Sequence, residues 1–161
     1  MSNFDFSELK VLICDDSLQI RALIKQCLMA FGIQNIVDAM DAKTGFQELV
    51  DTDPDLVITD WEMPTGNGID FVQHIRRSPD SPNPYVPIIM LTGYTELDRV
   101  KIARDNGVSS FLAKPVSAVS LYRRLVSLVE DQRLFVRSDS FFGPDRRFKV
   151  SETLEGPDRR V

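Results

Sequence analysis

The sequence predicts an α/β fold in which a doubly wound, five-stranded parallel sheet, (βα)5, is followed by a C-terminal extension. Five short apolar runs alternate along the chain with segments whose apolar residues recur at helical spacing. The apolar runs are nearly continuous, which is typical of parallel strands that are buried on both faces. Right-handed crossovers then leave a doubly wound open sheet as the simplest topology.

The first strand and the first helix are marked most clearly. Residues 10–14 (KVLIC) form a compact apolar run, and apolar residues recur at helical spacing over residues 20–31. Ser17 is suited to cap the amino end of this helix, and Gly32 is placed to stop it.

The second and third units follow the same pattern. Residues 36–39 predict a short strand, and residues 44–50 a second helix. Residues 55–59 (DLVIT) are again a continuous apolar run, and this run ends in Asp60. After a turn-rich stretch (MPTGNG), apolar residues at helical spacing predict a third helix over residues 69–75.

The last two units come after a loop at residues 78–87, which is too rich in proline to form a regular element. Residues 87–91 (PIIML) predict a fourth strand, and residues 96–106 a helix that an Asn-Gly turn closes. Residues 110–113 predict a short fifth strand, and the apolar residues within 121–129 mark a fifth helix.

The composition predicts a soluble, cytoplasmic protein. The chain of 161 residues has a net charge of -5 and a pI near 4.9, so a nucleic-acid-binding surface is not expected. No apolar run approaches the roughly 20 residues of a bilayer span, and the acidic N-terminus is unlike a secretory signal. Cys14 and Cys27 each lie in an apolar stretch, which favours two reduced, buried thiols over a disulfide.

A shift in composition divides the chain into a domain at residues 8–131 and a tail at residues 132–161. The tail has seven basic and five acidic residues, and it is too short for an independent output domain. Phenylalanines are interleaved with arginines in it, and the sequence GPDRR occurs twice, at residues 143–147 and 156–160. Packing of these rings on the chain's own domain and docking of a partner fit this pattern equally well.

Charged and polar residues follow the predicted strands at their carboxyl ends, where the ligand crevice of such a sheet lies. They are three carboxylates, one hydroxyl and one ammonium group: Asp15, Asp16, Asp60, Thr92 and Lys114. Carboxylates held so close together repel one another, and Mg²⁺ is a cation that prefers such oxygen ligands. A carboxylate beside Mg²⁺ can act as a nucleophile toward a phosphoryl group, with Thr92 and Lys114 binding the phosphoryl oxygens.

The segments around these residues resemble the receiver domains of bacterial two-component response regulators, including the single-domain chemotaxis type. They contain an acid pair, Asp-x-x-Met-Pro-x-x-x-Gly, Thr-Gly and Lys-Pro in this order. The resemblance covers about residues 8–131. The matching segments are VLICDDS at residues 11–17, DLVITDWEMPTGNGID at 55–70, PIIMLTG at 87–93 and FLAKPV at 111–116.

The resemblance implies a flavodoxin-like fold and a role for each acidic residue. Asp60 would accept a phosphoryl group from a phosphohistidine of a sensor histidine kinase or a histidine phosphotransfer protein. Asp15 and Asp16 would hold Mg²⁺ together with Asp60 and the backbone carbonyl of Glu62. The side chain of Glu62, two residues after Asp60, is a departure from the family pattern, because it places a fourth acid near the site that would slow or redirect hydrolysis of the phosphoryl group.

The resemblance also implies how the phosphoryl group is sensed. Lys114, joined to Pro115 by a cis peptide bond, would contact it. Thr92 would move toward a phosphoryl oxygen, and Phe111 would be the coupled aromatic residue that rotates inward. Many relatives have Tyr at the position of Phe111. Because Phe has no hydroxyl to form a hydrogen bond, switching here must act through packing or through the loop alone.

The sequence as a whole predicts a stand-alone receiver, a signalling module rather than an enzyme, which catalyses its own phosphorylation and dephosphorylation. The expected partners are the phosphodonor protein and a downstream protein, with no DNA and no membrane. The face formed by the helix at residues 96–106, the strand at 110–113 and the last helix is the candidate surface for a homodimer.

Two alternative functions remain open. The first is a scaffold of the same fold that signals without phosphate, and the complete set of five site residues argues against it. The second is a phosphohydrolase or phosphotransferase that acts on small molecules. The lack of a substrate-capping insertion in the sequence argues against this second alternative.

Two other side chains are given structural roles. His74, the only histidine, is expected to be a solvated residue on a helix rather than a phosphodonor. Trp61 follows Asp60 directly and is expected to cover the rim of the crevice, while a binding role for it is equally open.

Overall fold

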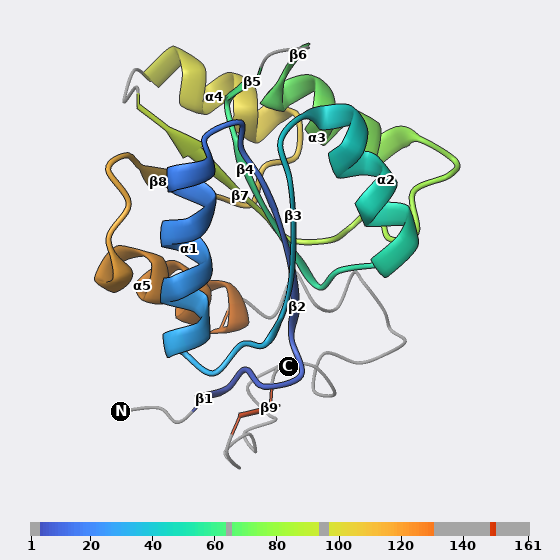
Figure 1. The fold of residues 1–161 in the computed structure, drawn as a ribbon. Coiled ribbons are helices and arrows are strands. Elements are labelled where there is room, and N and C mark those ends of the chain that lie inside the picture. The colour runs from blue at the N-terminus through green and yellow to red at the C-terminus, as the bar shows by residue number, and fades with distance from the viewer. Residues whose placement is uncertain (1–3, 64–65, 94–96, 131–148, 151–161) are drawn as a thin grey trace.

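The computed structural model describes residues 4–63, 66–93, 97–130 and 149–150, and it confirms the predicted fold class (Figure 1). Five parallel strands form the central sheet in the order β3-β2-β4-β7-β8. The chain adds β3 on one side of β2 and all later strands on the other side, so the order reverses between β2 and β4. The strands are β2 (Lys10–Cys14), β3 (Asn35–Ala39), β4 (Leu56–Asp60), β7 (Ile88–Thr92) and β8 (Ser110–Ala113).

Helices cover both faces of this sheet (Figure 1). Two of them pack on one face and three on the other, and each face has its own hydrophobic core. The first face carries α1 (Leu18–Ala30) and α5 (Ala118–Glu130), and the second carries α2 (Ala42–Thr52), α3 (Gly68–Arg77) and α4 (Leu97–Asp105).

Strand β2 shows how one apolar run serves both cores. Val11 and Ile13 belong to the core under α1 and α5, whereas Leu12 and Cys14 belong to the core on the opposite face. Successive side chains of a strand point to opposite faces, so a continuous apolar run is what a doubly covered strand requires. Cys14 and Cys27 are both buried and free, which confirms the prediction of two reduced thiols.

The predicted start of α1 is confirmed. The Ser17 hydroxyl accepts the backbone N–H of Ile20 at 3.2 Å, and Gly32 follows the helix with a φ of 97° that suits glycine. Helix α2 begins two residues earlier than the apolar pattern predicts. Asp41 explains this, because its carboxylate accepts the N–H of Thr44 at 2.8 Å and caps the helix at that point.

Strands β4 and β7 each lie one residue further along the chain than the apolar runs predict. Asp60 and Thr92 are therefore the last residues of their strands and not the first residues after them. The reason is the ladder between the two strands, in which the N–H of Trp61 still donates to the carbonyl of Leu91 at 3.1 Å. Asp55 stands outside β4, and its carboxylate accepts the N–H of Lys10 at 2.9 Å.

Two small antiparallel pairs were not predicted. Strands β5 (Glu62–Met63) and β6 (Gly66–Asn67) pair beside the end of β4, and β1 (Phe4–Asp5) pairs with β9 (Lys149–Val150). The rest of the tail, including its phenylalanines and both GPDRR copies, lies outside the described residues. The boundary after residue 131 stays a prediction. Within the part of the chain that is described, no helix is long and apolar enough to cross a membrane.

Candidate phosphoryl-transfer site

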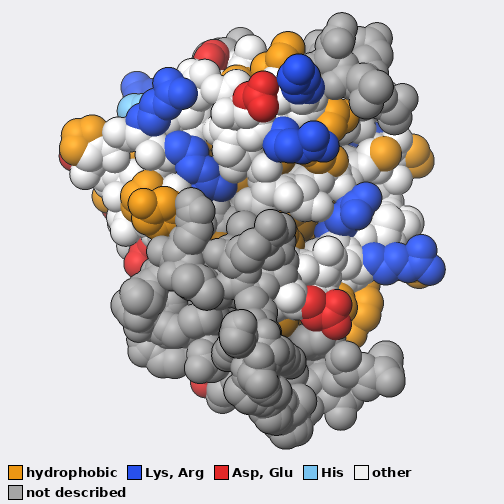
Figure 2. All heavy atoms as spheres, turned by 180° about the vertical axis from the view of Figure 1, so that it is seen from behind, with side chains coloured by type: hydrophobic (Ala, Val, Ile, Leu, Met, Phe, Trp, Pro, Cys, Tyr) orange, Lys and Arg blue, Asp and Glu red, His pale blue; other side chains and the backbone are white. Residues whose placement is uncertain are grey.

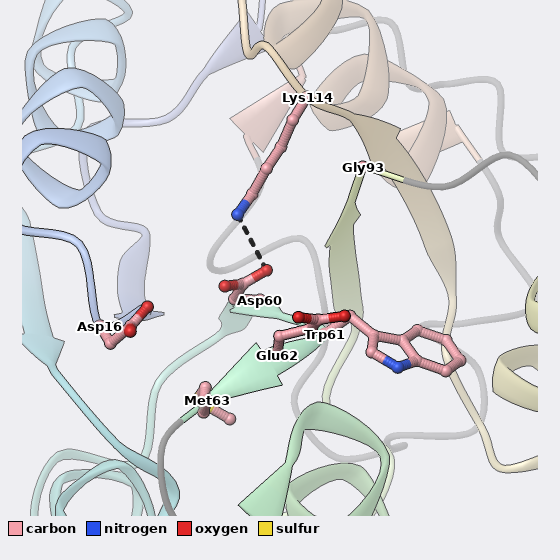
Figure 3. A pocket seen from close by; sticks show the side chains of 7 residues that line it. All are labelled: Asp16, Asp60, Trp61, Glu62, Met63, Gly93 and Lys114. Atoms are coloured by element: carbon pink, nitrogen blue, oxygen red, sulfur yellow. Dashed lines mark ion pairs between the residues drawn. The ribbon is translucent and has the colours of Figure 1, made fainter.

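The carboxyl ends of the central strands form one edge because neighbouring strands pair in register. Cys14 lies opposite Thr59, and Asp60 lies opposite Leu91. The residues that follow β2 and end β4 thus meet where the strand order reverses, which is where open α/β sheets bind ligands. A pocket of about 470 Å³ opens at this edge (Figure 3), lined by Asp16, Asp60, Trp61, Glu62, Met63, Gly93 and Lys114.

Asp60 and Lys114 form the closest charged pair of this pocket. The Asp60 carboxylate, in a residue that is only 5% exposed, lies 3.0 Å from the Lys114 ammonium nitrogen (Figure 3). Lys114 is joined to Pro115 by a cis peptide bond, as predicted, and its N–H donates to the carbonyl of Thr92 at 2.9 Å. These bonds place the lysine side chain over the end of β4.

The electrostatic balance keeps Lys114 charged. Burial by itself lowers the pKa of this ammonium group, but the hydrogen bond to Asp60 and the negative charges of Asp60 and Asp15 outweigh burial. The net pKa of Lys114 is raised. The pocket therefore offers a protonated amine that can contact a second anionic group.

Asp15 is fully buried and is not among the described residues that line the pocket. One carboxylate oxygen accepts the N–H of Ser17 at 2.8 Å, while the other, Oδ2, has no hydrogen-bond partner and lies 3.7 Å from the Lys114 nitrogen. Burial raises the pKa of Asp15, and the neighbouring charge of Asp60 raises it further, against the opposing effects of Ser17 and Lys114.

The three carboxylates of Asp15, Asp16 and Asp60 each offer one oxygen within 4.8 Å of the other two. Asp16 is exposed and lines the pocket, and the other two are buried. One lysine cannot neutralise three carboxylates. A donor set made only of oxygens, one of them buried without a hydrogen bond, fits a small hard cation such as Mg²⁺.

Thr92 and Phe111 lie on β7 and β8, and neither is among the described residues that line the pocket. Thr92 is buried at the end of β7, directly before Gly93. Phe111 is half-buried on β8 and packs against the core on the side of α2, α3 and α4. The structure thus brings Asp15, Asp16, Asp60 and Lys114 together, while Thr92 and Phe111 lie on the strands β7 and β8.

The response regulator receiver domain family matches residues 11–126 of the chain. The chain belongs to this family. The chemotaxis protein CheY-3 of Vibrio cholerae is 33% identical to it over 122 residues, which are 76% of this chain and 92% of that relative. The chemotaxis protein CheY of Pseudomonas aeruginosa is 31% identical over 122 residues, which are 76% of this chain and 97% of that relative.

Solved structures agree with this assignment. The chemotaxis response regulator CheY4 of Vibrio cholerae superposes with a TM-score of 0.67 at 28% identity, over 79% of this chain and 98% of that chain. A response regulator receiver domain protein of Clostridium thermocellum gives a TM-score of 0.68 at 29% identity, over 78% of this chain and 98% of that chain. The predicted resemblance to chemotaxis receivers is confirmed. Such receivers are signalling proteins activated by phosphorylation, and the family binds Mg²⁺ at an acidic pocket.

Gly68 is a residue of the receiver domain whose structural role the sequence did not reveal. A Cβ atom at this position would overlap with the carbonyl oxygen of Asp60 and lie 3.1 Å from the Cα of Trp61. The N–H of Gly68 also donates to the carbonyl of Trp61 at 2.6 Å. Only a residue without a side chain allows α3 to begin this close to the end of β4. The glycine of the Asp-x-x-Met-Pro-x-x-x-Gly motif was the available signal.

Trp61 and Glu62 form part of the rim of the receiver pocket. Trp61 lines the pocket, which agrees with the expected place at the rim, but it is only 9% exposed and also packs in the core on the side of α2, α3 and α4. Glu62 is exposed (Figure 3). Met63 also lines the pocket, and its sulfur lies 3.3 Å from the buried thiol of Cys14. His74 is exposed on α3 and stacks edge-on against Phe46, which agrees with the expected solvated position.

Proposed function

We propose that this receiver accepts a phosphoryl group on Asp60 from a phosphohistidine of a sensor histidine kinase or a histidine phosphotransfer protein. The main support is the placement of Asp60, because its carboxylate lies in an open pocket and contacts a lysine that stays protonated. Asp60 is also the member of the acid cluster that is both buried and in contact with the pocket.

In the proposed reaction a carboxylate oxygen of Asp60 attacks the phosphorus atom of the phosphohistidine. The new oxygen–phosphorus bond forms as the phosphorus–nitrogen bond breaks, and the imidazole of the donor leaves with the bonding electron pair and takes up a proton. Lys114 binds a phosphoryl oxygen through its ammonium group. Attack of water on the phosphorus atom of the acyl phosphate later releases inorganic phosphate and restores the carboxylate.

Asp15 and Asp16, together with Asp60 and the backbone carbonyl of Glu62, are the groups that would hold Mg²⁺. When bound, this cation offsets the negative charge that three carboxylates and the incoming phosphoryl group bring together. The support in the structure is the carboxylate cluster and the buried oxygen of Asp15 that lacks a hydrogen bond.

Thr92 is proposed as the residue that senses the phosphoryl group, because it ends the strand next to Asp60. Its hydroxyl gains a hydrogen bond to a phosphoryl oxygen only in the phosphorylated state. Phe111 lies on β8, opposite Met90 of the neighbouring strand β7, and packs against the core. Because it has no hydroxyl, it responds to the movement of Thr92 through packing alone. The two side chains thereby couple the pocket to α4, β8 and α5, a bistable element in this proposal.

The face formed by α4, β8 and α5 is the proposed contact surface for a downstream protein or for a second copy of the chain. On the side of the molecule shown in Figure 2, basic side chains are spread over the surface with few acidic ones between them. A partner with an acidic surface would complement this arrangement. The exposed charged residues in the described part of α4 and α5 are mostly basic: Lys101, Arg104, Arg123 and Arg124, against Asp105 and Glu130.

The acceptor assignment is tested by intact-protein mass spectrometry after incubation with Mg²⁺ and acetyl phosphate. We expect one added phosphoryl group on the wild type and none on Asp60→Asn. Asp70→Asn, which removes an exposed carboxylate from the first turn of α3, is the matched control and should gain the group as the wild type does.

Acid-labile phosphate on Asp60→Asn would overturn the acceptor assignment. A folded wild type that gains no phosphoryl group from acetyl phosphate or from phosphohistidine donors would instead favour a scaffold that signals without phosphate.

A further inference from the structure

Arg21 of α1 connects the backbone of the acid cluster to the neighbouring strand β3. Its Nε donates to a carboxylate oxygen of Asp38 at 2.8 Å, and its Nη1 donates to the backbone carbonyl of Asp15 at 2.7 Å. The Arg21 side chain is only 14% exposed, so both bonds are largely shielded from water. Arg21 is not among the described residues that line the pocket, and the proposed function gives it no role.

Asp15 is held by hydrogen bonds from three directions. Its N–H donates to the carbonyl of Ala39 on β3 at 3.1 Å, and one of its side-chain oxygens accepts the N–H of Ser17 at 2.8 Å. Its carbonyl accepts the bond from Arg21. Strand β3, helix α1 and the residue that caps this helix therefore fix the first member of the acid pair.

Asp16, the second member of the pair, has no such support for its side chain. It is exposed and lines the pocket, and its carboxylate takes part in no hydrogen bond or ion pair within the described part of the chain. The carbonyl that Arg21 holds belongs to the peptide group between Asp15 and Asp16, and a peptide group is planar. The direction of this carbonyl therefore sets where the Cα atom of Asp16 lies relative to the cluster.

A guanidinium is suited to hold this carbonyl because it is planar and its donors point in fixed directions. Asp38 binds one side of the Arg21 guanidinium, which aims the other side at the Asp15 carbonyl. The second oxygen of Asp38 lies 3.4 Å from the Lys25 ammonium nitrogen. Lys25 thus contacts the same carboxylate as Arg21, but no hydrogen bond or ion pair joins it to Asp15 among the described residues.

We infer that Arg21 is a positioning residue for the cation site, which acts through the Asp15 carbonyl to hold the Asp16 carboxylate in place for Mg²⁺. The inference rests on the proposed function, in which Asp16 is one of the groups that hold the cation. Charge and position have opposite effects here. Removing a positive charge beside three carboxylates should by itself strengthen cation binding, whereas loss of the positioning should weaken it.

Mg²⁺ titrations of the full chain, followed by the backbone amide signals in NMR at constant ionic strength, measure the dissociation constant. We expect Arg21→Met to bind Mg²⁺ about tenfold more weakly than the wild type, as is typical when a residue that orients a metal ligand is lost. Arg21→Lys keeps the charge but not the two oriented donors, and it should weaken binding at least about threefold. Lys25→Met, the matched control, removes a positive charge from the same carboxylate and should leave the dissociation constant within about twofold.

A second measurement separates positioning from a general disturbance of the pocket. The rate at which acetyl phosphate labels Asp60 is followed by mass spectrometry at increasing Mg²⁺ concentrations. For Arg21→Lys the rate should be low at limiting Mg²⁺ and approach the wild-type rate at saturation, because Asp60 and Lys114 are unchanged. A rate that stays low at saturating Mg²⁺ would show that Arg21 does not act through cation binding, and it would overturn the inference.

The outcomes also distinguish this inference from the proposed function. Wild-type affinity in Arg21→Lys, or tighter Mg²⁺ binding by Arg21→Met, would overturn the positioning role alone, since the wild type would still bind the cation. If Arg21→Met does not fold, Arg21→Lys decides the question. If the wild type shows no saturable Mg²⁺ binding near Asp60, the cation site of the proposed function is wrong and the positioning role fails with it.

Discussion

Asp15 is a carboxylate whose surroundings disfavour its charge. It is fully buried, one of its oxygens lacks a hydrogen bond, and burial together with the charge of Asp60 raises its pKa. The Lys114 ammonium nitrogen, 3.7 Å from Oδ2 of Asp15, offsets part of this negative charge. A buried charge without sufficient partners destabilises the folded state. The surroundings of Asp15 therefore fit a cation site, in which the metal ion is the missing partner of the carboxylate.

Replacing Asp15 by Asn should raise the stability of the metal-free protein by about 1 kcal/mol, a typical size for one substitution. Asn keeps the bond to the Ser17 N–H and removes the repulsion with Asp60. The same change should abolish the stabilisation that Mg²⁺ gives the wild type, which is about 2.7 kcal/mol at 100 times the dissociation constant. Urea unfolding with and without Mg²⁺ measures both effects.

The difference in stability between metal-free Asp15→Asn and the metal-free wild type should change with pH in a defined direction. The folded-state pKa of Asp15 lies above its ordinary value of 3.8. The contribution of this carboxyl group to the free energy of unfolding is therefore fully present below pH 3.8, and it is lost as the pH rises through the raised pKa. The advantage of Asp15→Asn should thus be larger at neutral pH than in acid. A metal-free Asp15→Asn protein that is less stable than the wild type at neutral pH would contradict this account.

At the scale of elements, the contact between α3 and the end of β4 depends on Gly68. Gly68→Ala would force a methyl group into the carbonyl of Asp60, so the helix must retreat or β4 must shift. We expect a loss of about 2–4 kcal/mol in the free energy of unfolding. Labelling of Asp60 by acetyl phosphate should also slow, and the rate of adduct formation by mass spectrometry measures this second effect.

Gly93→Ala is the matched control for this substitution. Gly93 also lines the pocket, but a Cβ at this position meets no atom within 4 Å. The free energy of unfolding of Gly93→Ala should stay within about 0.5 kcal/mol of the wild-type value. Equal losses in the two variants would show that the tight approach at Gly68 does not limit stability.

The placement of Asp60 and Lys114 could be predicted because it depends on a local rule: parallel strands in register end at one edge. The strand ends themselves were one residue off for β4 and β7, since the ladder continues into polar residues that a hydrophobic pattern cannot distinguish from a loop. The contact of Arg76 with Gly107 spans 31 positions of the chain, and no local pattern reports it.

At the scale of the whole molecule, the two cores share one sheet, and each core contains one of the two cysteines. Cys14 lies in the core under α2 and α3, and Cys27 in the core under α1 and α5. Burial raises the pKa of the Cys14 thiol to about 12, helped by the charges of Asp41 and Asp15, and burial also raises the pKa of Cys27. Both thiols are buried, and their raised pKa values disfavour the reactive thiolate in the native protein at pH 8.

Because β2 and β4 contribute side chains to both cores, we expect the two layers to unfold together. Pulses of iodoacetamide at pH 8 across a urea series, followed by peptide mapping, should show both cysteines becoming reactive at one midpoint. Labelling of Cys27 at clearly lower urea than Cys14 would show that the α1–α5 layer opens first and that the two layers are separate cooperative units.

Trp61 gives the molecule a further property. It is the single tryptophan of the chain, it follows Asp60 directly, and it lines the pocket while only 9% of it is exposed. An indole in such a position is an intrinsic fluorophore whose emission depends on the groups beside it. The chain thus carries an optical probe at its own binding pocket, so that cation and phosphoryl-analogue titrations can be followed in real time on the unlabelled protein.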